Sequence, residues 1–251
     1  MSRNVNFGAV ERRHGRLRSR HHGPPNMPDY ELIDISHTVE HGMITYKGLP
    51  APIISDHLSR EESKRNYEEG TEFHIGKIEM VANTGTYLDS PFHRYADGSD
   101  LAALDLYSLA NVDGIVVRFV EERTREIDES VVRSLDVKGK AVLFQTNWDL
   151  HWRTEQYWSG KHPFLSAAAA QYLAESGASL VGIDSYNIDN TEGGSRPAHS
   201  ILLRHNIPIV EHLCGLRDLP DNGFKFFAVP VKVRNFGTFP VRAFAVVPKK
   251  N

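Results

Sequence analysis

The sequence predicts an α/β domain built on a mixed β-sheet that is flanked by helices. Eight short apolar or β-branched runs, typical of buried strands, cover residues 32–35, 73–81, 115–119, 141–145, 180–183, 208–210, 224–229 and 241–247. Helical patterns lie between several of these runs, and strands outnumber helices, which favours a mixed sheet over a doubly wound parallel one. A chain of 251 residues with 40% hydrophobic content can bury a substantial core.

The clearest helix is expected over residues 167–176. Ser166 can cap its first turn, and Gly177 stands just past its end, where a left-handed residue is favoured. Apolar spacing predicts two more helices, over 101–110 and 127–135. An amphipathic run that opens near His199 predicts a fourth, followed by a strand that ends at Glu211.

The N-terminal 28 residues are expected to form a basic, disordered tail, and residues 29–251 a single domain. The tail holds six arginines and one acid and ends in Gly23-Pro24-Pro25, a boundary signal. Its arginines are also compatible with a nucleic-acid arm or a mitochondrial leader, but a disordered tail is favoured over both, and the tail lacks the apolar core of a secretory signal. Beyond it, 23 basic residues face 31 acidic ones, a formal charge of −8. We therefore expect neither a nucleic-acid nor a membrane partner.

The single cysteine, Cys214, excludes an intrachain disulfide and a cysteine-based zinc site. A cytoplasmic location is expected on this ground. A lone cysteine in an apolar setting is more often a small buried residue than a nucleophile.

The stretch from Asn83 to His93 has the residue types of a hydrolytic site. Gly85 permits a sharp turn, and Pro91 holds the preceding residue extended, so Asp89 and His93 are expected on a loop that leaves a strand. Taken alone, this D-x-P-x-H pattern is equally typical of a strand, a turn and a capping aspartate. Two residues far along the chain favour the hydrolytic site over this structural alternative. They are His199 and, twelve positions later, Glu211.

The order of these residues resembles the cyclase-like metal-dependent hydrolases, the family of bacterial kynurenine formamidase and isatin hydrolase. The resemblance runs from about residue 32 to residue 247, through segments 46–50, 83–93, 147–149, 162–165, 182–185 and 237–242. It implies a fold of swivelling β/α/β layers, a small-molecule substrate, and a homodimer or homotetramer.

The resemblance also implies roles for individual residues. Asp89, His199 and Glu211 match metal ligands, and His93 matches the group that transfers the proton. The family motif H-x-G-T-H-x-D-x-P-x-H has histidines where this chain has Asn83 and Tyr87. Because neither replacement is a usual zinc ligand, a full binuclear site is not expected.

Three arrangements remain open for the residues that are left. Asp89, His199 and Glu211 can hold one zinc or manganese ion with a position open for water. Alternatively, Tyr87 and Asn83 can donate hydrogen bonds to an oxyanion without a metal, with His93 as general base. In the third arrangement, catalysis is lost and the pocket binds a ligand.

The implied reaction is hydrolysis of an aryl formamide, as in the conversion of N-formylkynurenine to kynurenine and formate. A compact site with aromatic walls would suit this substrate. Phe92, Trp148 and Phe164 are candidates for the wall, although each is more often ordinary core. Opening of a cyclic amide or lactone, as in isatin hydrolase, would use the same groups.

Overall fold

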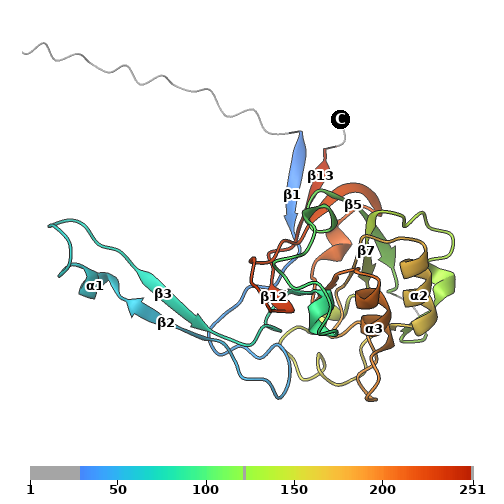
Figure 1. Cartoon of the computed structure of the whole chain (residues 1–251), viewed down its shortest axis with the longest axis horizontal. Helices are drawn as coiled ribbons and strands as arrows, with labels where there is room; N and C mark the ends of the chain where they lie inside the picture. Colours follow the sequence, from blue (N-terminus) through green and yellow to red (C-terminus); the bar gives the residue numbers. More distant parts are fainter. Residues whose placement is uncertain (1–28, 121–122, 250–251) are drawn as a thin grey trace, which may run out of the picture.

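The computed structural model describes residues 29–120 and 123–249, and a nine-stranded mixed sheet runs through them (Figure 1). The strand order is β1-β13-β11-β5-β7-β9-β10-β4-β12. Its strands are β1 (Tyr30–Asp34), β4 (Tyr87–Asp89), β5 (Val112–Arg118), β7 (Lys140–Gln145), β9 (Leu180–Ile183), β10 (Ile209–Glu211), β11 (Asn222–Phe227), β12 (Thr238–Pro240) and β13 (Phe244–Pro248). The pairs from β5 to β10 are parallel and the others antiparallel. The predicted mixed sheet is confirmed.

Two helices cover one face of this sheet: α2 (Ala167–Glu175) and α3 (Pro197–Arg204). Their buried residues form one core cluster with side chains of β5, β7, β9 and β10. A second cluster fills the opposite face and takes in residues of β11 and β13. A separate pair of short strands is formed by β6 (Glu126–Ile127) and β8 (Phe164–Leu165). Among the described residues, no helix is both long and apolar enough to cross a membrane.

Helix α2 follows the sequence signals closely. The Ser166 side chain accepts a hydrogen bond from the backbone N–H of Ala169, and Gly177 has a φ of +75° just past the helix end. These local interactions satisfy backbone groups that a helix leaves unpaired at its ends.

The helices expected over 101–110 and 127–135 are absent. The first range holds only the 3₁₀ turn η2 (Leu106–Ser108), and the second holds the end of β6 and η3 (Glu129–Val131). In each, an aspartate captures the backbone N–H two residues on: Asp105 that of Tyr107, and Asp128 that of Ser130. Each aspartate has an extended backbone and caps the turn that follows it, so a helix cannot run through its position. The other 3₁₀ turns are η1 (Pro91–His93), η4 (Trp148–His151) and η5 (Leu216–Asp218).

Residues 53–79 form an arm that projects from the body of the molecule (Figure 1). The arm consists of β2 (Ile53–Leu58), the short helix α1 (Arg60–Ser63) and β3 (Ile75–Glu79). Within the described part of the chain, β2 pairs only with β3. A capping box at Ser59 and Glu62 starts α1. The tail expected over residues 1–28 lies outside the described residues.

Candidate active site

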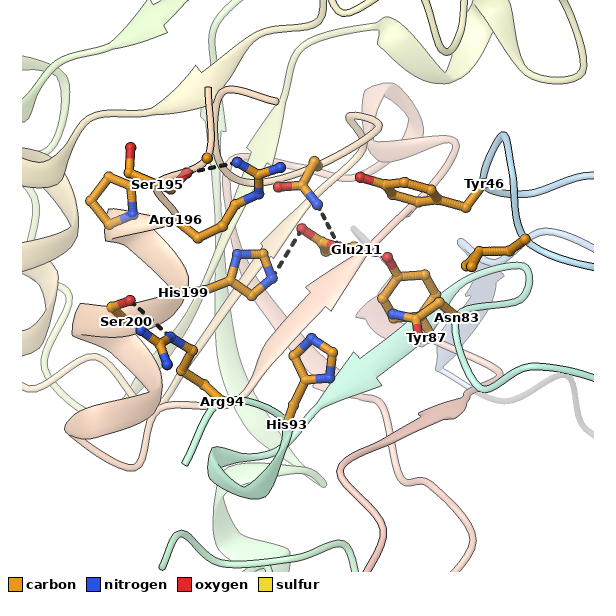
Figure 2. A pocket seen from close by; sticks show the side chains of 14 residues that line it. Tyr46, Asn83, Tyr87, His93, Arg94, Ser195, Arg196, His199, Ser200 and Glu211 are labelled. Carbon is orange, nitrogen blue, oxygen red and sulfur yellow. Dashed lines mark hydrogen bonds and ion pairs between the residues drawn. The ribbon is translucent and has the colours of Figure 1, made fainter. Parts of the chain in front are cut away.

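A cavity of about 600 Å³ lies where β4, β10 and the start of α3 meet (Figure 2). His93, His199 and Glu211 lie at its centre. An aromatic side with Tyr46 and Tyr87 flanks them, and so does a cationic side with Arg94 and Arg196. Its lining residues are Tyr46, Leu49, Asn83, Tyr87, His93, Arg94, Asn187, Gly194, Ser195, Arg196, Pro197, His199, Ser200 and Glu211.

The register of β4 brings distant residues to this cavity. In the pairing with β10, Tyr87 lies opposite Glu211, and in the pairing with β12, Asp89 lies opposite Thr238. Tyr87 and Asp89 are two residues apart, so their side chains point to the same face of the sheet. A strand of three residues therefore organises four side chains of the site.

The side chain of Asp89 begins a chain of hydrogen bonds that leads to His93. The Thr238 hydroxyl donates to Asp89 Oδ1, so its oxygen accepts from His93 Nδ1, at 2.8 Å. This order places the proton of the neutral His93 ring on Nδ1 and leaves Nε2 as the acceptor. Gly237 permits the approach, because a Cβ there would lie 2.6 Å from the His93 backbone. Asp89 is the last residue of β4 and not part of the expected loop, whereas His93 follows the strand in the short 3₁₀ turn η1.

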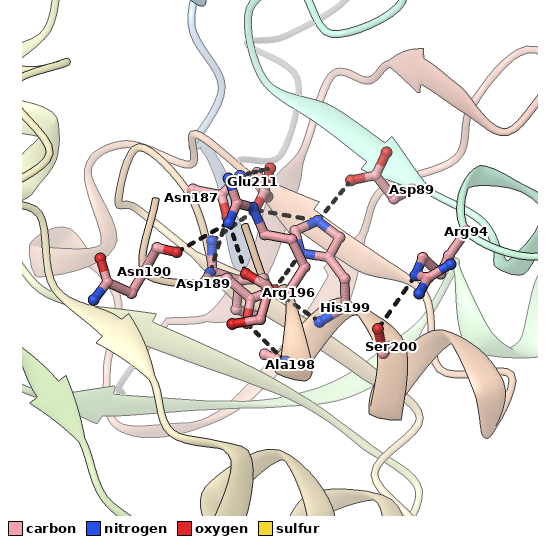
Figure 3. Close-up of polar contacts among 12 residues, drawn as sticks. Asp89, Arg94, Asn187, Asp189, Asn190, Arg196, Ala198, His199, Ser200 and Glu211 are labelled. Atoms are coloured by element: carbon pink, nitrogen blue, oxygen red, sulfur yellow. Dashed lines mark hydrogen bonds and ion pairs between the residues drawn. The ribbon is translucent and has the colours of Figure 1, made fainter. Parts of the chain in front are cut away.

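Asp189 orients His199 (Figure 3). One carboxylate oxygen accepts from the backbone N–H of Ala198, and the other accepts from the backbone N–H of His199 and lies 2.7 Å from its Nδ1. The carboxylate thus caps α3 and holds the imidazole proton on Nδ1. His199 Nε2 is turned toward Asp89 Oδ2, at 3.7 Å, and Glu211 Oε1, at 3.6 Å.

Glu211 is held by Tyr87 and by the loop after β9. The Tyr87 hydroxyl donates to Glu211 Oε2 over 2.7 Å, and the backbone N–H of Ile188 donates to Oε1 over 2.7 Å. Burial, and then the charges of Glu211 and Asp89, raise the pKa of Tyr87 well above its ordinary value, while a hydrogen bond with Asn83 opposes them. Tyr87 is therefore a neutral hydrogen-bond donor and not a phenolate ligand.

The charges of the site fit a cation. Burial alone would lower the pKa of His199, but Glu211, Asp189 and Asp89 together raise it to about 10. Burial raises the pKa of Glu211 to about 7, against the charge of His199. Three buried carboxylates thus share one imidazole, which leaves negative charge that a divalent ion would neutralise.

One oxygen of Asp89 is placed to bind a metal ion. Its Oδ2 is buried and has no hydrogen-bond partner among the described residues. Within that part of the chain, one ligand atom each from Asp89, His93 and His199 lies within 4.8 Å of the others. This carboxylate and imidazole set suits zinc or manganese. Glu211 touches His199 but lies outside the triad, and both of its oxygens already accept hydrogen bonds.

Replacing Asp189 by asparagine is expected to weaken metal binding by about 10- to 100-fold, because partners that fix a ligating histidine contribute affinity of that order. Competition with a chromogenic chelator measures the affinity. Asp97→Asn is the matched control, since Asp97 is exposed and pairs with Arg204 at the other end of α3. Equal affinities in the two variants would contradict the orienting role of Asp189.

The prediction that Phe92, Trp148 and Phe164 form an aromatic wall is wrong, because none of the three lines the cavity. Trp148 packs with Tyr157 and Tyr186 in a separate cluster and donates to the Tyr157 carbonyl. Phe164 lies in β8 beneath the Arg125 guanidinium. Tyr46 and Leu49 line the cavity instead, and both belong to the segment that precedes the arm.

Sequence reasoning missed three residues of the site: Asp189, Thr238 and Arg94. Asp189 belongs to an acidic stretch that resembles a calcium loop by composition alone, and only the fold brings it to His199. Thr238 lies within segment 237–242, one of the segments that carry the family resemblance, but the resemblance gave this residue no role. Arg94 directly follows His93, and no motif distinguishes it.

The fold and the site together define a hydrolase of the cyclase type. The chain belongs to the Cyclase family, whose model matches residues 33–190, more than half of the chain. It is 28% identical over 219 residues to a kynurenine formamidase of Bacillus cereus, covering 86% of this chain and 98% of that one. It is also 28% identical over 202 residues to a kynurenine formamidase of Erythrobacter litoralis, covering 80% and 87%.

Solved structures share the fold. An isatin hydrolase bound to the product analogue thioisatinate superposes with a TM-score of 0.73 at 21% identity, over 88% of this chain and 94% of that one. A predicted metal-dependent hydrolase from Bacillus stearothermophilus gives a TM-score of 0.68 at 24% identity, over 86% and 98%. At these identities the likeness concerns the fold alone.

Proposed function

We propose that this protein hydrolyses the C–N bond of an aryl formamide, with N-formylkynurenine as the substrate that yields kynurenine and formate. The observation that carries the proposal is the convergence of Asp89, His93 and His199 on one cavity. The kynurenine formamidases of similar sequence support the choice of substrate. The same convergence speaks against a relative that only binds a ligand.

Each side chain of the site has a distinct task in this reaction. Asp89 and His199 would hold one zinc or manganese ion, with His93 or Glu211 near enough to complete the set. A bound ion would supply a Lewis acid for the formyl carbonyl and for water. His93 Nε2, the free acceptor of that ring, takes the proton of the attacking water and returns it to the leaving amine. Tyr87 holds Glu211 in place through its hydroxyl.

Arg94 is the residue that we assign to the amino-acid end of the substrate. Its Nε donates to the Ser200 hydroxyl over 3.2 Å, and no carboxylate of the described residues lies within 4.0 Å of its guanidinium. Arg196, the other arginine of the cavity, donates through Nη1 to three backbone carbonyls. The terminal nitrogens of Arg94 can therefore pair with the α-carboxylate of N-formylkynurenine.

Formate release from N-formylkynurenine, compared with release from the uncharged formanilide, tests the proposal. The wild-type enzyme, supplied with zinc or manganese, is expected to hydrolyse both. Arg94→Gln should raise KM about 10- to 100-fold for N-formylkynurenine and leave formanilide unchanged, because a charged hydrogen bond contributes about 1.5–3 kcal/mol. Turnover of isatin without turnover of either formamide would overturn the proposal in favour of ring opening.

A further inference from the structure

Ser200 is a half-buried serine of α3 that lines the active-site cavity (Figure 2). In a helix, a serine hydroxyl usually faces water or donates to the backbone carbonyl four residues earlier. Here the Ser200 oxygen accepts a hydrogen bond from Arg94 Nε over 3.2 Å, and no acceptor for the hydroxyl hydrogen lies within hydrogen-bond distance in the described part of the chain. The hydrogen is therefore free to bind a ligand of the cavity.

The contact with Arg94 determines how this hydroxyl can be used. A guanidinium N–H can only donate, so the Ser200 oxygen is the acceptor in this bond, and its hydrogen points elsewhere. The contact also occupies Nε of Arg94 and leaves the two terminal nitrogens, Nη1 and Nη2, for a ligand. The terminal N–H groups of Arg94 and the O–H group of Ser200 are thus neighbouring donors (Figure 3).

Tyr95 fixes Arg94 and Ser200 relative to each other. Its hydroxyl donates to the backbone carbonyl of Ser200 over 2.8 Å, and the Arg94 guanidinium lies over its ring, 5.2 Å from the centroid. The Arg204 guanidinium lies over the same ring at 5.0 Å. Contacts of this kind hold the donors in place before a ligand arrives, and preorganised groups lose less free energy on binding.

The donors and the reacting groups come from the same two short segments. Arg94 directly follows His93 at the end of η1. Ser200 directly follows His199 in α3. Each segment therefore supplies one imidazole to the centre of the cavity and one donor beside it (Figure 2). A substrate whose scissile bond lies at the centre must carry its complementary group at a distance that these adjacent residues set.

A carboxylate is the group that matches these donors. It carries one negative charge and offers only acceptors, about four lone-pair positions on two oxygens. Arg94 has no carboxylate within 4.0 Å among the residues that the structure describes, whereas Nη1 of Arg196 already donates to three backbone carbonyls. A planar guanidinium fork beside a hydroxyl therefore favours a planar, singly charged carboxylate over an uncharged group.

We propose that Ser200 is a specificity-determining residue, which donates its hydroxyl hydrogen to the carboxylate of the substrate beside Arg94. The role rests on the proposed function, because N-formylkynurenine is the formamide whose α-carboxylate Arg94 would bind. It restricts the preferred substrates to formamides that carry a carboxylate, since an uncharged formamide gains nothing from this hydroxyl. Because the contact is remote from the scissile bond, its loss should change KM and leave kcat unchanged.

Replacing Ser200 by alanine tests the role through two substrates. Alanine favours a helix, so α3 should form as in the wild-type chain. The KM for N-formylkynurenine should rise about 10-fold, as expected for a hydrogen bond to a charged group, while the KM for formanilide stays unchanged. Formate release measures both. Ser176→Ala, at a half-buried serine of α2 outside the cavity, is the control and should match the wild-type chain with both substrates.

A double variant separates donation to the substrate from mere positioning of Arg94. If Ser200 contacts the carboxylate itself, R94Q/S200A should have a several-fold higher KM for N-formylkynurenine than R94Q alone. Equal values in these two variants, or a wild-type KM in S200A, would overturn the role of Ser200 and leave the proposed function standing. A wild-type chain that released formate from neither substrate would overturn both.

Discussion

Replacing Asp89 by asparagine is expected to abolish tight binding of zinc or manganese and to lower kcat/KM about 1000-fold. Asp89 Oδ2 is buried, has no hydrogen-bond partner in the described part of the chain and faces His199 Nε2, so the amide would remove the charge that draws a cation to this point. Metal catalysis contributes several kcal/mol, and a 1000-fold loss corresponds to about 4 kcal/mol. Plasma mass spectrometry of protein purified without chelator gives the metal content per chain, and formate release gives the rate.

The control for this variant is Asp136→Asn, which makes the same chemical change at an exposed residue. Asp136 pairs with Lys140, and surface pairs of this kind contribute little to stability. Its metal content and rate should equal those of the wild-type chain. If Asp89→Asn kept one ion per chain, the assignment of Asp89 as a ligand would fail. If the wild-type chain bound no ion and still turned over formamide, the metal-free arrangement with Tyr87 and Asn83 would replace it.

Replacing His93 by alanine is expected to lower kcat about 100- to 10,000-fold with the metal content unchanged. General acid–base groups contribute a factor of this size. The hydrogen bond from His93 Nδ1 to Thr238 leaves Nε2 to carry the proton, and added imidazole should restore part of the rate. Formate release with and without imidazole measures both effects.

The same variant separates the two roles that the geometry allows for His93. The ring offers a ligand atom close to those of Asp89 and His199, so it can also serve as a metal ligand. Loss of the ion from His93→Ala would identify a ligand and contradict the proton-transfer role. His205→Ala, at the exposed end of α3, is the control and should change neither quantity.

The elements that could be predicted from sequence are those whose stabilising contacts are local. Helix α2 has its cap at Ser166 and its terminating glycine at Gly177, both adjacent to the helix. The expected helix over 101–110 failed for an equally local reason, because Asp105 has an extended backbone in the middle of this range and caps a new turn there. Apolar periodicity indicates which residues are buried, but it does not register side-chain capture of the backbone.

The site could be predicted only in part, because its supporting contacts are distant in sequence. Asp89, His93 and His199 were recognisable from a motif and its resemblance to a family. Thr238 contacts Asp89 across 149 positions, through a strand register that the tertiary fold sets. The prediction of three aromatic residues lining the cavity was wrong because aromatic residues are as typical of the core as of a substrate pocket.

The cap of α3 links the integrity of the site to the stability of a short helix. The Asp189 carboxylate satisfies the first backbone groups of α3 and also fixes the imidazole ring of His199. The first turn of this eight-residue helix therefore cannot fray without releasing the ring. A local opening, far smaller than global unfolding, is enough to inactivate the enzyme. We therefore expect the activity to depend on the stability of this turn as well as on that of the whole fold.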